Sequence, residues 1–114
     1  MKYEVMMTSQ AVADLRTVFE YIAYELLVGQ TALNQLDRLE KAIEGLEEMP
    51  ERHHVYEKEP WKSRNLRVMP VDNYLVFYIA EKEEKRVTVI RIMYGRRDIE
   101  TQLKAHTSDK GSDK

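Results

Sequence analysis

The sequence of 114 residues contains no cysteine, so disulfide bonds and thiolate metal sites are excluded. This absence is compatible with a reducing cytoplasm, where we expect the protein to be located. No apolar run approaches the roughly 20 residues that a membrane span needs, and the first residues lack the apolar segment of a signal peptide. The sequence therefore predicts a cytoplasmic protein without a membrane partner.

Glycine and proline are scarce, with four and three residues respectively. The chain has no glycine-rich phosphate loop, no nucleophile elbow and no paired-carboxylate motif. The three histidines are His53, His54 and His106, and no carboxylates are spaced around them as a metal site would require. We therefore expect neither a metal nor a cofactor.

Charge is unevenly distributed along a chain whose net charge is only −2. Residues 1–51 carry four basic and ten acidic residues, a balance of −6. Residues 52–106 carry twelve basic and eight acidic residues, a balance of +4. The basic half could meet nucleic acid or another acidic partner, or the asymmetry could be uneven surface charge without a partner.

The length predicts one domain, over residues 1–106, followed by a polar tail at 107–114 that we expect to be disordered. Alternation over residues 3–8 predicts a short strand, and Thr8 or Ser9 can cap the helix predicted for 11–27. Val12 is the first member of its apolar face, and Gly29 is expected to terminate it in the left-handed conformation. A second helix is predicted from Thr31 to just before Pro50.

Three β-rich runs follow, at 64–69, 74–80 and 86–93, and a last helical turn is expected within 99–106. The order β-α-α-β-β-β predicts an α+β fold, with a helical hairpin packed on one face of a mostly antiparallel four-stranded sheet. We expect the other face of the sheet to be open to a partner.

Arginines are the leading candidates for binding, because the guanidinium fork suits phosphate and carboxylate groups. Arg91 stands out, since it lies inside an apolar strand; it either has a function or pairs with a carboxylate such as Asp98 or Asp72. One residue of the pair Arg96–Arg97 is expected to be structural and the other to face a partner. The candidate partner-binding residues are Arg64, Arg67, Arg91, Arg96, Arg97 and Trp61.

Other side chains could act in catalysis. His54, beside His53, could be a general acid or base or plain surface. Tyr94 could donate a proton or stack on a base, or be half core and half surface. Trp61 is expected to be either a flap over the core edge or a partner contact. If the protein is an enzyme, the candidate catalytic residues are Arg67, Arg91, Tyr94, Arg97 and His54.

The chain resembles the RelE/ParE superfamily of toxins from type II toxin–antitoxin, or plasmid stabilisation, modules. Four segments carry the resemblance: Ser9–Leu15 (SQAVADL), Tyr21–Ala23 (YIA), Arg67–Tyr78 (RVMPVDNYLVFY) and Val89–Asp98 (VIRIMYGRRD). Together with the order of elements, they extend the resemblance over about residues 3–103. The resemblance implies one fold with two activities. RelE-like members are metal-independent, ribosome-dependent mRNA endoribonucleases, and ParE-like members poison DNA gyrase.

Comparison of single positions favours the ParE side. Many RelE-like ribonucleases have an arginine where this chain has Leu75, and lysines where it has Ser63 and Asn65. The C-terminal tyrosine of some ribonucleases falls near Glu100. An aliphatic side chain at Leu75 cannot stabilise a phosphorane. We expect a gyrase-directed toxin rather than an enzyme, with an mRNA endoribonuclease and a non-toxic antitoxin-binding module as alternatives.

The resemblance also implies a partner. A small antitoxin would bind the toxin in a hetero-oligomer, with a helical or extended segment lying across apolar toxin surface. Its acidic residues could cover the arginines, as electrostatic complementarity favours. The target would be DNA gyrase or the ribosome with its mRNA.

Overall fold

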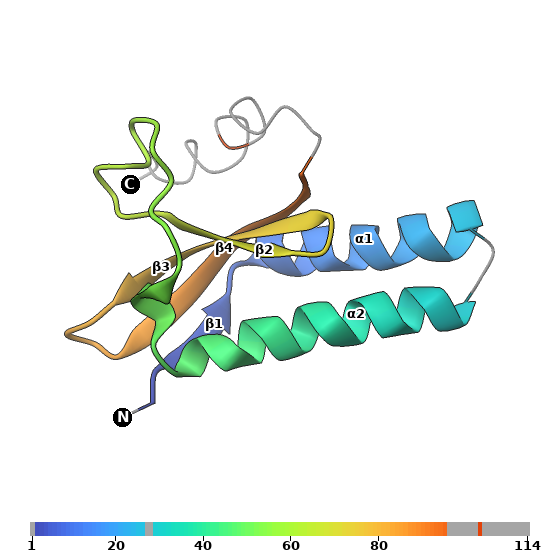
Figure 1. Cartoon of the computed structure of the whole chain (residues 1–114), viewed down its shortest axis with the longest axis horizontal. Helices are drawn as coiled ribbons and strands as arrows, with labels where there is room; N and C mark the ends of the chain where they lie inside the picture. Colours follow the sequence, from blue (N-terminus) through green and yellow to red (C-terminus); the bar gives the residue numbers. More distant parts are fainter. Residues whose placement is uncertain (1, 27–28, 96–102, 104–114) are drawn as a thin grey trace.

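The computed structural model describes residues 2–26, 29–95 and 103. Its elements follow in the predicted α+β order (Figure 1). They are β1 (Glu4–Met7), α1 (Ser9–Leu26), α2 (Gly29–Glu44), the 3₁₀ turns η1 (Gly45–Glu47) and η2 (Pro50–Arg52), β2 (Arg67–Val71), β3 (Tyr74–Glu81) and β4 (Arg86–Tyr94). The predicted last helical turn and tail lie outside the described residues, Leu103 excepted.

The four strands form one sheet in the order β1-β4-β3-β2. β3 pairs antiparallel with β2 and β4, whereas β1 pairs parallel with β4. The mostly antiparallel sheet is thus confirmed. Pro70 lies in β2 at the edge of the sheet, where a missing backbone N–H is tolerated. Within the described part of the chain, no helix has the length and apolar character that crossing a membrane requires.

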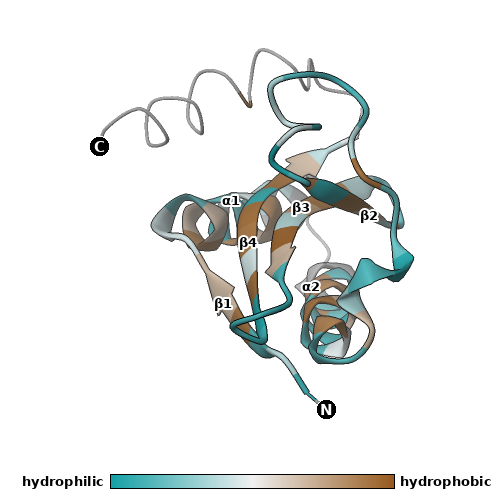
Figure 2. Ribbon diagram, turned by 90° about the vertical axis from the view of Figure 1, so that its left-hand side faces the viewer, coloured by the Kyte–Doolittle hydropathy of each residue, from teal (hydrophilic) through white to brown (hydrophobic). Residues whose placement is uncertain are grey.

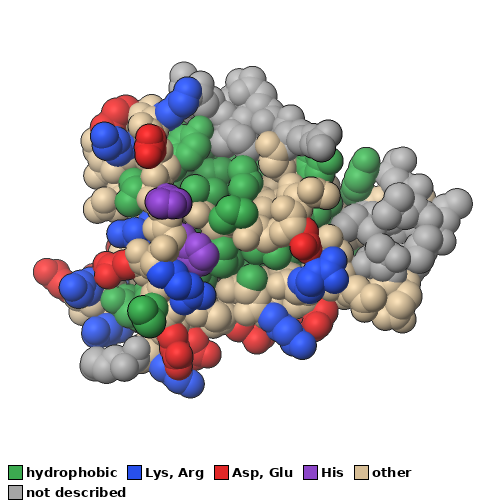
Figure 3. Space-filling view, viewed as in Figure 1, with side chains coloured by type: hydrophobic (Ala, Val, Ile, Leu, Met, Phe, Trp, Pro, Cys, Tyr) green, Lys and Arg blue, Asp and Glu red, His purple; other side chains and the backbone are tan. Residues whose placement is uncertain are grey.

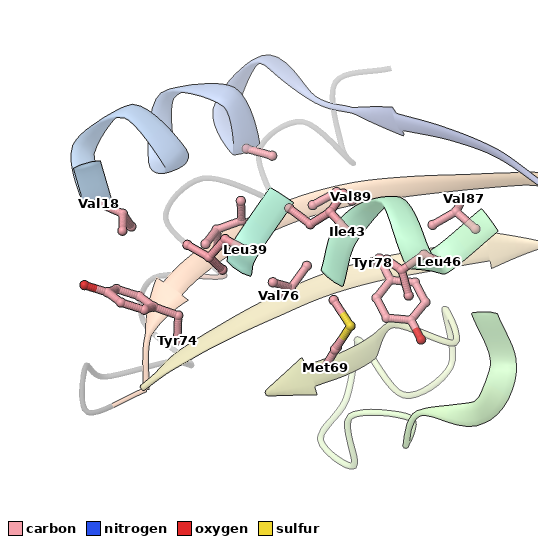
Figure 4. Packing of buried hydrophobic residues seen from close by; sticks show 12 residues of the cluster. Val18, Leu39, Ile43, Leu46, Met69, Tyr74, Val76, Tyr78, Val87 and Val89 are labelled. Carbon is pink, nitrogen blue, oxygen red and sulfur yellow. The ribbon is translucent and has the colours of Figure 1, made fainter. Parts of the chain in front are cut away.

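Both helices pack on one face of the sheet, as predicted (Figure 2). Leu39 and Ile43 of α2 meet Val76 of β3 and Val89 of β4 in the main core, which Figure 4 shows from close by. β3 contributes Tyr74, Val76 and Tyr78 at every second position, because successive side chains point to opposite faces. β4 contributes Val87, Val89 and, beyond a shift in its pairing with β3, Ile92. Residues of α2 contribute at spacings of three and four, which is the pattern that the sequence displays.

The opposite face of the sheet is not open, contrary to prediction. A second cluster covers it, made of Trp61, Leu66, Phe77, Met93 and Leu103, all of them at most 4% exposed. Loop residues that precede β2 supply two of these side chains, and Figure 2 shows this loop on the side of the sheet away from α2. Trp61 and Leu66 thus anchor the loop on this outer face of the sheet.

Several predicted boundaries shift. Thr8 does cap α1, since its Oγ1 accepts the N–H of Ala11 at 3.0 Å. Val12 is 45% exposed, so the buried face of α1 runs through Ala11 and Val18 instead. Gly29 begins α2 and does not end α1. The strand predicted at residue 64 begins at Arg67, because the preceding residues form turns.

Candidate functional site

Asp14 and Arg91 form a buried ion pair between α1 and β4. Arg91 Nε lies 2.8 Å from Asp14 Oδ2, and Arg91 Nη2 donates to Asp14 Oδ1 at 3.2 Å. Asp14 also accepts the amide of Gln10 and the backbone N–H of Ile92, at 3.0 and 2.9 Å. A buried charge needs such partners, since its desolvation is otherwise costly. Part of the hydrogen-bonding capacity of Arg91 is therefore engaged inside the domain.

The same carboxylate completes the edge of β4 where β1 ends. β1 accompanies β4 as far as the pairing of Met7 with Val89. Beyond it, Thr8 Oγ1 donates to the carbonyl of Ile90 at 3.0 Å, and Asp14 accepts the N–H of Ile92. Two side chains thus replace the missing strand as hydrogen-bond partners of this edge, which fixes α1 against β4.

The predicted partners of Arg91 were Asp72 and Asp98. The prediction of Asp72 is wrong. Its carboxylate accepts hydrogen bonds from Arg38 Nε at 2.7 Å and from Gln35 at 2.9 Å. These hydrogen bonds connect the β2–β3 turn to α2. These hydrogen bonds lower the pKa of Asp72. Asp98 lies outside the described residues. Asp14, which was not predicted as the partner of Arg91, lies on the buried face of α1 four residues before Val18.

An open pocket of about 180 Å³ lies beside this ion pair, between α1 and the end of β4. Tyr94 lines it and is half-buried, with its ring centroid 5.6 Å from that of Tyr74. Tyr21, on α1, is 58% exposed at the pocket. The full lining consists of Asp14, Thr17, Val18, Tyr21, Tyr74, Arg91, Ile92, Met93 and Tyr94.

The connection that follows α2 is held by donors to its backbone carbonyls. Arg52 Nη1 donates to the carbonyls of Glu48 and Met49, at 2.7 and 3.3 Å. Arg67 Nη1 donates to those of Glu51 and His53, at 3.1 and 2.7 Å. The Tyr78 hydroxyl donates to Pro50 from inside the core. Arg67 thus stabilises the backbone of this connection. The buried environment of Tyr78 raises the pKa of its hydroxyl to about 12.

His53 and His54 have different environments in this connection. His53 is half-buried, with its ring edge-on to Tyr78 at a centroid distance of 6.3 Å. Burial, together with the charges of Arg52 and Arg67, lowers the pKa of His53. His54 is exposed. In Figure 3, the two histidines in view lie side by side among Lys, Arg, Asp and Glu side chains.

Trp61 and Arg64 lie in the loop before β2. Trp61 is 3% exposed, which agrees with the prediction of a flap over the core edge. The guanidinium carbon of Arg64 lies 5.1 Å from the centroid of the Trp61 ring, and Arg64 is exposed. Arg96 and Arg97 lie outside the described residues.

The structure therefore separates most of the candidates. It brings Arg91 close to Tyr94 at one end of the sheet, and Arg67 close to the two histidines at the β2 edge. Among the described residues, no group of three His, Asp or Glu side chains could hold a metal ion. Leu75 packs partly buried against the second cluster and offers no polar atom from its side chain.

Comparison with protein families gives a match over residues 5–99 to the ParE toxin of the type II toxin–antitoxin system parDE. The chain belongs to the ParE toxin family. No curated protein sequence matches it.

Solved structures of low sequence identity share the fold of this ParE-family toxin. The chromosomal ParDE system from P. aeruginosa aligns with a TM-score of 0.65 at 16% identity, covering 82% of this chain and 96% of that one. A mutant of the E. coli toxin RelE in the free state aligns with a TM-score of 0.63 at 15% identity, covering 96% of this chain and 98% of that one. The M. tuberculosis toxin–antitoxin complex RelBE2 aligns with a TM-score of 0.58 at 19% identity, covering 82% of this chain and 99% of that one.

Proposed function

We propose that the protein is a growth-inhibiting toxin that acts on DNA gyrase in the ParE manner. The observation that carries this proposal is the engagement of two of the arginines predicted as catalytic in a ribonuclease. Arg91 binds Asp14 in the protein interior, and Arg67 donates to the backbone carbonyls of Glu51 and His53. Part of the hydrogen-bonding capacity of each guanidinium group is therefore committed to the fold rather than to stabilising an RNA phosphate.

The family match supports the proposal, because it is to the ParE toxin and covers most of the chain. Leu75 supports it too. This residue occupies the strand position at which many RelE-like ribonucleases carry arginine, and its side chain packs against apolar neighbours.

We further propose that a cytoplasmic antitoxin holds the toxin inactive. Structural neighbours of this chain include toxin–antitoxin complexes. The exposed side chains of Tyr21 and Tyr24, at 58% and 75%, lie on α1 and offer apolar contact area to a folded or extended segment. An acidic segment would complement the exposed cations of the second half of the chain.

Purified gyrase tests the proposal directly. The toxin should trap cleaved DNA, and its induction without antitoxin should activate DNA-damage signalling. Addition of antitoxin encoded by an adjacent reading frame should reverse both effects. Normal supercoiling and no cleaved DNA in the presence of toxin would contradict a gyrase-directed function.

A ribosome-dependent mRNA endonuclease is the second candidate. The observation that favours it is the placement of Tyr94 beside Arg91 at a pocket, in a fold shared with RelE. Primer extension after induction should then show cuts within translated codons. Growth arrest with intact transcripts would eliminate this candidate, and the absence of any arrest would indicate a non-toxic antitoxin-binding module.

A further inference from the structure

The loop of residues 56–66, which we call the flap, is a firmly anchored part of the surface. Its two ends are joined, since Tyr56 N donates to the carbonyl of Leu66 at 2.7 Å. Leu66 is fully buried and Trp61 nearly so, both against the sheet face away from the helices. Within the flap, Glu59 Oε1 accepts from the Ser63 N–H at 3.1 Å and from its hydroxyl at 2.7 Å. The flap therefore presents its charged side chains from a defined backbone.

Those charged side chains are mainly cationic. The flap carries Lys58, Lys62 and Arg64 against Glu57 and Glu59, a balance of +1 in a chain of net charge −2. Arg52 and Arg67 flank it and raise the balance over residues 52–67 to +3. Lys58, Lys62 and Arg64 are all exposed on the flap itself. Of the two carboxylates, Glu59 is engaged by Ser63. The positive charge is thus local, and the rest of the chain opposes rather than assists attraction of a polyanion.

Arg64 is held in a way that suits phosphate binding. Its guanidinium carbon lies over the Trp61 ring, 5.1 Å from the centroid, which is within the range of a cation–π interaction. The planar guanidinium carries five N–H donors in a geometry that matches phosphate. Because the Trp61 ring is itself fixed in the second cluster, less side-chain freedom is lost when Arg64 binds an anion.

We propose that the flap is a contact surface for the phosphate backbone of duplex DNA. The flap projects from the body of the domain at the end remote from the tip of the helical hairpin (Figure 1). A projecting surface with several exposed cations can contact successive phosphates of a duplex. The inference rests on the proposed function, since a poison of gyrase acts where that enzyme holds DNA. Contacts to phosphate give affinity without sequence preference.

The test measures binding of the full chain to a short fluorescent DNA duplex by anisotropy, between about 50 and 200 mM salt. The double variant Lys62→Gln/Arg64→Gln should lower the slope of log K against log salt by about 1.8, because each phosphate contact contributes about 0.9. The matched control is Arg16→Gln/Lys82→Gln, which removes the same charge from exposed residues outside the flap. Its slope should equal that of the unaltered protein.

A second variant guards against a folding defect. Lys62→Glu leaves Arg64 and Trp61 intact, so circular dichroism should show a folded protein, and its DNA affinity should still fall. The proposal would be overturned if the flap variants and the unaltered protein had equal salt slopes, or if the flap and control variants lost equal DNA affinity. Binding of single-stranded RNA but not duplex DNA would also overturn it. So would a flap variant that loses antitoxin binding while its DNA binding is unchanged. None of these measurements uses gyrase, so failure here is distinguishable from failure of the gyrase assay.

Discussion

Asp14 binds the guanidinium group of Arg91 and the backbone N–H of Ile92 with one carboxylate oxygen, Oδ2. Both residues of the pair are at most 9% exposed, so water would solvate either charge poorly if the other were removed. The pair thus links the first helix to the last strand and removes the most conspicuous arginine of the sequence from the surface.

Removal of one charge of this pair should destabilise the fold strongly. We expect Asp14→Ala to lower the free energy of unfolding by about 3–5 kcal/mol, because the buried charge of Arg91 then lacks the carboxylate of Asp14. Urea denaturation measures the change. Asp14→Leu/Arg91→Met should recover much of the loss, and Asp37→Ala, in an exposed pair with Lys41, should have little effect. A loss from Asp14→Ala as small as that from Asp37→Ala would contradict the buried pair.

Stability should decline in mild acid because of His53. The pKa of His53 is lowered in the folded state from its ordinary 6.5, so the unfolded chain binds the proton more readily. The contribution of neutral His53 is present above pH 6.5 and is lost as the pH falls below it. Thermal unfolding between neutral and mildly acidic pH should show this loss, and His53→Gln should reduce it. His54→Gln is the control, and an equal effect of the two substitutions would argue against burial as the cause.

Tyr78 should make the protein sensitive to strong base. Its pKa is raised to about 12 in the folded state, from an ordinary 10, by burial. The folded state then keeps the proton that the unfolded chain releases, so stability is full below pH 10 and falls as the pH rises toward 12. Tyr78→Phe should remove this part of the alkaline loss. At neutral pH it should cost about 1–3 kcal/mol, since the carbonyl of Pro50 loses its buried donor. Urea denaturation at neutral pH measures the loss of the hydrogen bond to Pro50. Urea denaturation at alkaline pH, between 10 and about 12, measures the contribution of the Tyr78 proton.

Arg67 and Arg64 should behave differently when each is changed to glutamine. Arg67→Gln removes the donor to the carbonyls of Glu51 and His53 and should cost about 1–3 kcal/mol of stability. Arg64→Gln, on exposed surface, should cost much less. Amide hydrogen exchange should locate the Arg67→Gln effect in residues 48–54. If exchange in that connection is unchanged, the carbonyl contacts of Arg67 do not hold it.

Much of the fold was predictable because its signals are local. The β-branched and aromatic residues of β3 and β4 and the spacing of Leu39 and Ile43 in α2 are each signals within a single element. The candidate site was less predictable. The partner of Arg91 lies 77 residues away, and no local pattern marks Asp14 as that partner. The burial of Trp61 on the outer sheet face depends likewise on contacts with Phe77 and Leu103, far along the chain.

The pairing of β1 with β4 also bears on the synthesis of the protein. The first strand finds its only partner in the described sheet when the last one is present, because no other strand lies beside it. Contacts between such distant segments are slow to form, and a nascent chain cannot form them before its final strand has left the ribosome. A chain truncated before β4, or still being synthesised, would therefore lack its complete sheet.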